Sequence, residues 1–198
     1  LVQLGDNLAD SRVNVVFKGM GSNNNANGVG EVVVQPDSDR VWVLETNNAI
    51  ALYPFGGYAS FPLAWRSKAD TAAWHGTNSM VRTLAYSAKT KHLYVASRVG
   101  GTFIKVFDAA TGHYLMDLNT AGIAGGTYHI NMVTATPDGQ IFAGNLALAN
   151  GTFKLYHYAS EGAAPVLAWE GVVPGRAGDA MACTGTGKNV TVYVSGID

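Results

Sequence analysis

The side chains best suited to binding a neutral polar ligand gather in four short segments of the sequence. Residues 21–28, 74–79, 125–131 and 175–179 read GSNNNANG, WHGTNS, GGTYHIN and GRAGD. An Asn amide offers both donors and an acceptor, and an aromatic ring offers an apolar platform, so this combination suits sugars. A simpler interpretation is that Asn and Gly satisfy the backbone of tight loops. The predicted ligand-binding residues are Asn25, Trp74, His75, Asn78, Tyr128, His129, Asn131 and Arg176.

A metal site would need three converging ligands, and the sequence offers little toward one. None of the five His residues forms an HxH or HxxxH pair. His75 and His129 occupy similar segments, and Asp179 is the only comparably placed carboxylate that could join them. No glycine-rich segment begins a helix that could hold a phosphate group. We therefore predict neither a metal nor an organic cofactor.

Catalysis of glycan cleavage would need two carboxyl groups within about 5–10 Å of each other. Among the segments that could form a ligand-binding face, only Glu45 and Asp179 supply carboxylates, and they lie far apart in the chain. No GxSxG motif is present. We predict no catalytic residue, and the sequence favours a protein that is not an enzyme.

The candidate ligand segments recur because the chain contains an internal repeat of about 50 residues. Segments 31–45, 82–97, 131–145 and 180–196 share one plan, an apolar strand, a polar turn and a second strand with a central aromatic residue. Those aromatic residues are Trp42, Tyr94, Phe142 and Tyr193. We expect them to occupy equivalent places on the second strand of each repeat.

Two further strands follow each aromatic strand. The third strands are predicted at 49–55, 103–109 and 153–159, and the fourth at 61–67, 114–120 and 165–171. Four short strands per repeat are typical of a β-propeller blade, and no segment shows sustained helical periodicity. A β-sandwich is the alternative, but the shared four-strand plan favours the propeller. We predict an all-β fold, a β-propeller made of four-stranded antiparallel blades of about 50 residues that belongs to a larger ring.

The chain is predicted to be a single β-propeller region over residues 1–198. Whole blades are expected at about 29–74, 79–125 and 130–174, with a partial blade at 179–196 and an N-terminal strand at 12–19. The N-terminal strand could complete the partial blade, or the remaining blades could lie in further sequence or in a second chain. Because open blades expose apolar faces and strand edges, we expect either self-association or a second chain that completes the ring.

Composition excludes several kinds of partner. The net charge is −1 and only 14% of residues are charged, so no basic surface for nucleic acid is expected. No apolar run is long enough to span a bilayer. The single cysteine, Cys183, lies in an apolar run and is predicted to be a small buried side chain rather than a reactive thiol.

Residues 97–146, 153–171 and 175–187 resemble an uncharacterised family of exported bacterial β-propeller proteins, a domain of unknown function. The matching motifs are turns and strands, which concern architecture and not chemistry. The resemblance covers roughly residues 80–198. It implies an extracellular protein, secreted or at the cell surface, and a chain longer than this one. It implies no catalytic residue.

Together these patterns predict a non-catalytic extracellular β-propeller module that binds a polysaccharide or a protein, or builds a surface assembly. The alternative is an extracellular glycan hydrolase or lyase with a site at the mouth of the central channel. Convergent acid and base residues would distinguish the second function from the first.

Overall fold

The structure is a computed structural model that describes residues 80–197 without a break. It also describes residues 2–3, 12–13, 29–34, 40–45, 49–54 and 64–66. These residues form strands and turns, and none of them is helical. The predicted ligand-binding residues Asn25, Trp74, His75 and Asn78 lie outside the described residues.

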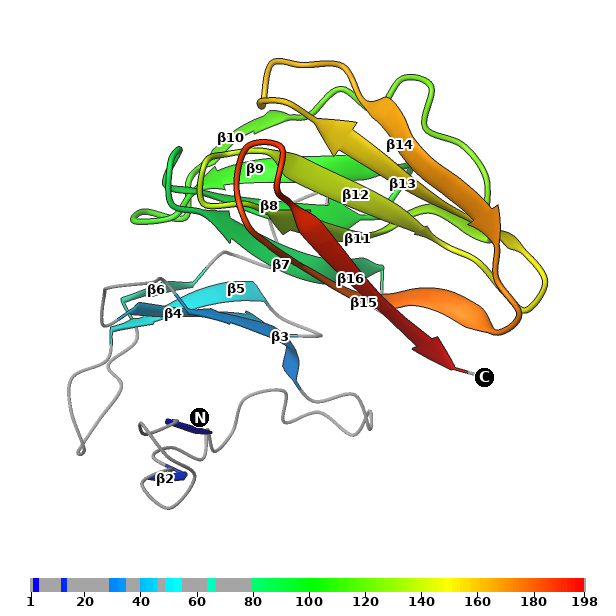
Figure 1. The fold of residues 1–198 in the computed structure, drawn as a ribbon. Helices are drawn as coiled ribbons and strands as arrows, with labels where there is room; N and C mark the ends of the chain where they lie inside the picture. The colour runs from blue at the N-terminus through cyan, green and yellow to red at the C-terminus, as the bar shows by residue number, and fades with distance from the viewer. Residues whose placement is uncertain are drawn as a thin grey trace.

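Three four-stranded antiparallel sheets follow one another along the chain (Figure 1). The first contains β3 (Val29–Val34), β4 (Arg40–Glu45), β5 (Ala49–Pro54) and β6 (Trp65–Arg66). The second contains β7 (Val81–Ser87), β8 (His92–Ser97), β9 (Phe103–Asp108) and β10 (Tyr114–Asp117). The third contains β11 (Tyr128–Ala135), β12 (Ile141–Leu146), β13 (Thr152–Tyr158) and β14 (Val166–Val172). In each sheet the strands pair in the order of the sequence.

Two shorter sheets lie at the ends of the chain. β15 (Arg176–Thr184) and β16 (Thr191–Ile197) form a two-stranded sheet, and β1 (Val2–Gln3) pairs with β2 (Arg12–Val13). The predicted N-terminal strand at 12–19 thus begins as part of a small hairpin, and its residues 14–19 lie outside the described ones. Among the described residues β16 pairs with β15 alone.

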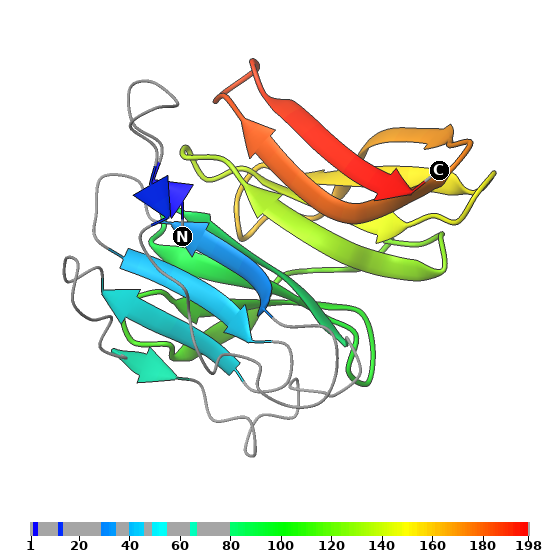
Figure 2. The same ribbon diagram turned by 90° about the horizontal axis from the view of Figure 1, so that it is seen from below.

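The first strands of successive sheets lie side by side, β3 with β7, β7 with β11, and β11 with β15. Seen from below, the successive sheets turn about these inner strands as blades do (Figure 2). The described chain is therefore all-β and built of consecutive propeller-type blades, as predicted.

The four repeat aromatic residues occupy equivalent positions, which confirms the repeat. Trp42, Tyr94, Phe142 and Tyr193 lie on β4, β8, β12 and β16, the second strand of each sheet. Their partners on the first strands are Val33, Ala85, Thr134 and Ala182.

Apolar clusters join each sheet to the next. Tyr94 and Val106 of the second sheet pack with Ile141 and Tyr158 of the third. On its other face the second sheet buries a cluster against which Trp65 of the first sheet packs. Both faces of the second sheet are thus covered by neighbouring sheets.

Polar side chains of the turns also connect the sheets. Tyr94 donates a hydrogen bond to the Glu161 carboxylate at 2.6 Å, and His92 lies 2.7 Å from the same oxygen. The Asp138 carboxylate accepts a hydrogen bond from the backbone N–H of Gly187 at 2.8 Å. Local turn chemistry alone predicts none of these contacts, because each joins residues about one repeat or more apart in the sequence.

The buried tyrosines predict an alkaline limit to stability. Burial raises the pKa of Tyr158, and burial together with a hydrogen bond to Glu161 raises the pKa of Tyr94. Unfolded tyrosine ionises near pH 10, so the contribution of both rings is complete below about pH 10 and is lost as the pH rises further. Tyr158→Phe removes the hydrogen bond to the Asn119 carbonyl, so we expect a loss of about 1 kcal/mol near neutral pH. That deficit should shrink or reverse at about pH 11 in urea denaturation. An equal deficit at both pH values would contradict this.

Candidate functional site

The described ligand-binding candidates lie at the starts of two neighbouring inner strands. Tyr128, His129 and Asn131 belong to β11, and Arg176 begins β15. The sequence predicted these strands to begin at residues 131 and 180, so Tyr128, His129 and Arg176 were expected in the preceding loops, but the strands begin earlier. The reason is a register irregularity between Tyr128 and Met132 on β11, and a second one between Ala177 and Ala180 on β15. Such bulges hide the regular alternation by which strands are recognised in a sequence.

Asn131 connects these two strands. Its side chain is fully buried, at 0% exposure, and its amide donates to the Gly178 carbonyl at 2.6 Å. Its amide oxygen accepts a hydrogen bond from the Arg98 guanidinium at 3.1 Å. Both ends of the amide are therefore engaged by the protein, and a ligand could reach it only if the surrounding chain moved.

Tyr128 and Arg98 form a cation–π pair beside Asn131. The Arg98 guanidinium carbon lies 3.7 Å from the centre of the Tyr128 ring, and Tyr128 is 42% exposed. Burial, followed by the positive charge of Arg82, lowers the pKa of Arg98. His129 is exposed next to Tyr128. Tyr128 and His129 therefore remain accessible to a ligand at this end of the sheets.

Arg176 and Asp179, three residues apart on β15, form an ion pair beside the register irregularity of this strand. The carboxylate that a catalytic or metal site would need is thus held by a guanidinium. Within the described part of the chain, no three His, Cys, Asp or Glu side chains gather as a metal site requires.

Close backbone packing explains the glycines of these strand starts. Gly178 has a positive φ of 94°, and a Cβ atom there would lie 2.1 Å from the Asn145 carbonyl oxygen. Gly126 has a φ of 70°, and a Cβ atom there would lie 2.5 Å from the Asn145 amide nitrogen. The simpler interpretation, that glycine serves the local backbone, therefore holds for both.

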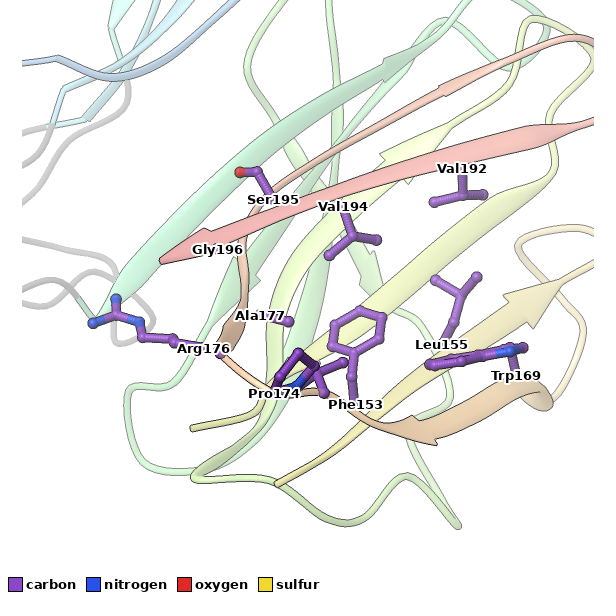
Figure 3. Close-up of a pocket in the computed structure, with 12 residues that line it drawn as sticks. Phe153, Leu155, Trp169, Pro174, Arg176, Ala177, Val192, Val194, Ser195 and Gly196 are labelled. Carbon is purple, nitrogen blue, oxygen red and sulfur yellow. The ribbon is translucent and has the colours of Figure 1, made fainter. Parts of the chain in front are cut away.

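An apolar groove that the sequence did not predict lies between the third sheet and the β15–β16 sheet. Phe153, Leu155 and Trp169 line one wall, and Val192 and Val194 line the other. Figure 3 shows Val194 pointing from β16 toward Phe153, with Leu155 and Trp169 further along the groove. The cavity volume is about 580 Å³. Gly175 and Arg176 lie at one end, so the groove opens beside the predicted ligand-binding residues.

Several large apolar side chains of β14 and β16 are exposed. They are Val166, Leu167, Trp169, Val172, Tyr193, Val194 and Ile197. Two of them, Trp169 and Val194, line the groove. Exposed apolar side chains gathered in a groove mark an interaction site more often than scattered apolar residues do.

Cys183 lies on β15, in contact with the third sheet. It is half-buried, and its sulfur lies 3.4 Å from the Thr134 hydroxyl. Burial raises the pKa of the Cys183 thiol, which disfavours the reactive thiolate.

Comparison with known proteins finds only distant structural similarity. No protein-family model matches the sequence, and no curated protein matches it. Similar solved structures include a DUF4623 family protein from Bacteroides eggerthii, with 15% identity over 76% of this chain and 40% of its own, and a TM-score of 0.45. Sqt1 from Saccharomyces cerevisiae is 13% identical over 74% of this chain and 36% of its own, with a TM-score of 0.45.

The computationally designed protein Ika8 is 16% identical over 84% of this chain and 45% of its own, with a TM-score of 0.48. This chain thus spans less than half the length of each of the three structures. In the described residues, no helix has the length and hydropathy that crossing a membrane would need.

Substitutions can distinguish the buried structural residue Asn131 from the accessible residues Tyr128 and His129. Asn131→Ala should lower the free energy of unfolding by about 1–3 kcal/mol, because buried partners lose their hydrogen bonds. Tyr128→Ala should cost about 0.5–1 kcal/mol, the value of an exposed cation–π pair. His129→Ala is the control and should stay within about 0.5 kcal/mol of the parent in urea denaturation. A loss for His129→Ala as large as that for Asn131→Ala would contradict this division.

Proposed function

We propose that this chain is a non-catalytic β-propeller module that binds a polypeptide partner in the groove between its third sheet and the β15–β16 sheet. Its setting is extracellular, secreted or at the cell surface, as expected for the exported bacterial β-propeller family that the sequence resembles. The observation that carries the proposal is the groove, whose lining includes the exposed side chains of Trp169 and Val194.

The chemistry of the groove favours a polypeptide over a charged ligand. Its lining is mainly apolar, and Arg176, at one end, is its single charged lining residue. Trp169, which is half exposed, lies beside Phe153 with ring centres 6.3 Å apart. Aromatic side chains that become buried when a partner binds often dominate the binding energy of protein interfaces.

A polysaccharide is the second candidate ligand, favoured by Tyr128 and His129. Both side chains are exposed at the starts of the inner strands, where the sequence places the other ligand-binding candidates. Such a ligand would be neutral, so its binding should depend little on salt. Trp74→Ala or Tyr128→Ala should weaken it by about 1–2 kcal/mol if the ring is a stacking platform.

Glycan cleavage is the alternative function. Asp179 is the carboxylate on which it would depend, and Arg176 pairs with it in the structure. If the protein cleaves a glycan and Asp179→Asn abolishes that cleavage, this alternative is established and the proposal is overturned.

Parallel binding screens test the proposal. The full chain is immobilised and presented with a random-peptide display library and with a panel of soluble polysaccharides that is also assayed for cleavage. We expect selected peptides whose affinity falls about tenfold or more in Trp169→Ala, the loss expected of an interface anchor. Leu115→Thr is the control, because Leu115 is an exposed apolar residue on β10 of another sheet. The proposal fails if no peptide is selected, or if every selected peptide binds Trp169→Ala unchanged.

A further inference from the structure

The internal repeat shows what fills the equivalent of this groove elsewhere in the chain. In each complete sheet the third strand pairs with the second and places an aromatic residue at one fixed position. Tyr53 lies opposite Val41, Phe107 opposite Leu93, and Tyr158 opposite Ile141.

Val192 of β16 occupies the register position of Leu93 and Ile141. It directly precedes Tyr193, as Leu93 precedes Tyr94 and Ile141 precedes Phe142. Its partner on the first strand is Cys183, one residue after the partner of Tyr193. In the described residues no strand lies opposite Val192 on the other side of β16.

The aromatic residue of the third strand packs against the preceding sheet. Phe107 and Tyr158 are 2% and 0% exposed, and Tyr158 packs in the cluster that joins the second and third sheets. Ile104 of β9 belongs to the same cluster and is fully buried. The neighbouring Leu118, whose N–H donates to the Ile104 carbonyl, is 3% exposed.

The matching side chains of the third sheet lack this cover. Leu155 corresponds to Ile104, because each lies opposite the residue two places after the repeat aromatic. Leu155 is half-buried, and Trp169, its partner on β14, is 50% exposed. These two side chains form one wall of the groove. The groove is thus the place that a third strand would occupy beside β16.

We propose that a separate polypeptide supplies this strand. It pairs antiparallel with Thr191–Ile197 of β16 and places an aromatic side chain opposite Val192, in the groove against Leu155 and Trp169. This proposal rests on the proposed function and specifies the partner as an extended, alternating segment. Main-chain hydrogen bonds would give affinity and the aromatic residue would give register, as in other strand additions.

The repeat supplies a defined probe for this site. A fluorescent peptide that copies residues 152–172, the third and fourth strands of the third sheet, should bind the 198-residue chain saturably in fluorescence anisotropy. Tyr158→Ala in the peptide should weaken binding about tenfold or more. His157→Ala in the peptide is the control, because in this register its side chain points away from the groove, and it should bind like the parent peptide.

Variants of the protein locate the site. Val194→Lys places a charge in the groove and should abolish binding of this peptide, whereas Leu115→Thr on β10 should leave it unchanged. Thermal unfolding of each variant shows that it is folded. Binding that Val194→Lys leaves intact would overturn the proposal.

Disulfide trapping tests the register. In a Cys183→Ser background, Val192→Cys is mixed with the peptide carrying Tyr158→Cys, with oxidised glutathione as the oxidant. Residues directly opposite in antiparallel strands bring their Cβ atoms within about 5 Å, so this pair should cross-link. The peptide carrying His157→Cys should not cross-link to it, because neighbouring side chains point to opposite faces. That peptide should instead cross-link to Tyr193→Cys. The reversed pattern, or equal trapping of all pairs, would overturn the register.

The outcomes also separate this proposal from the proposed function. If library peptides bind through Trp169 but none is trapped at Val192, the binding function stands and strand addition is wrong. Sedimentation velocity addresses the alternative occupant, a second copy. The groove takes another copy of this chain if the protein forms a dimer that Val194→Lys dissociates and that the peptide does not disrupt. That result would overturn the proposal of a separate partner.

Discussion

Each sheet of this protein has two faces to bury, and burial by the neighbouring sheet is the constraint on which the fold depends. The repeat aromatic residue shows it most directly. Tyr94 and Phe142 are buried where the following sheet packs over them, at 0% and 7% exposure. Tyr193 occupies the same position on β16 and is 58% exposed, and no following sheet lies among the described residues. The aromatic residue at this register position is therefore buried where a following sheet packs over it and exposed where no following sheet is described.

Polar contacts then fix how the sheets meet. Asn131, fully buried, ties β11 to β15 through the Gly178 carbonyl, and Glu161 reaches from the third sheet to Tyr94 of the second. Buried polar groups must find partners, so such links specify one arrangement of neighbouring sheets more sharply than apolar packing does. These polar contacts also engage side chains that the sequence alone would assign to a ligand. Asn131 and the Arg176–Asp179 pair are examples.

Local patterns made the architecture predictable from the sequence. The strand runs, the Gly- and Asp-rich turns and the aromatic residue of each repeat depend on nearby residues, and they placed Trp42, Tyr94, Phe142 and Tyr193 correctly. The strand starts at Tyr128 and Arg176 were missed because bulges break the alternation there. The groove was missed for a different reason. Its walls come from β13, β14 and β16, and exposure of Trp169 depends on which strands lie beside it and not on its neighbours in sequence.

The strand sequences themselves distinguish an edge from an interior position. The fourth strands of the three complete sheets form their outer edges, and they carry Arg66, Asp117 and Glu170. A charge on an edge strand opposes pairing with other chains. β16 reads TVYVSGI and has no charged residue and no proline, although its outer side is unpaired in the described chain. It has the composition of a strand with partners on both sides, like β12, which reads IFAGNL. An uncharged edge beside an apolar groove is unfavourable in water unless a further strand covers it. The third strand that we propose beside β16 would account for both the composition of β16 and the exposure of Trp169.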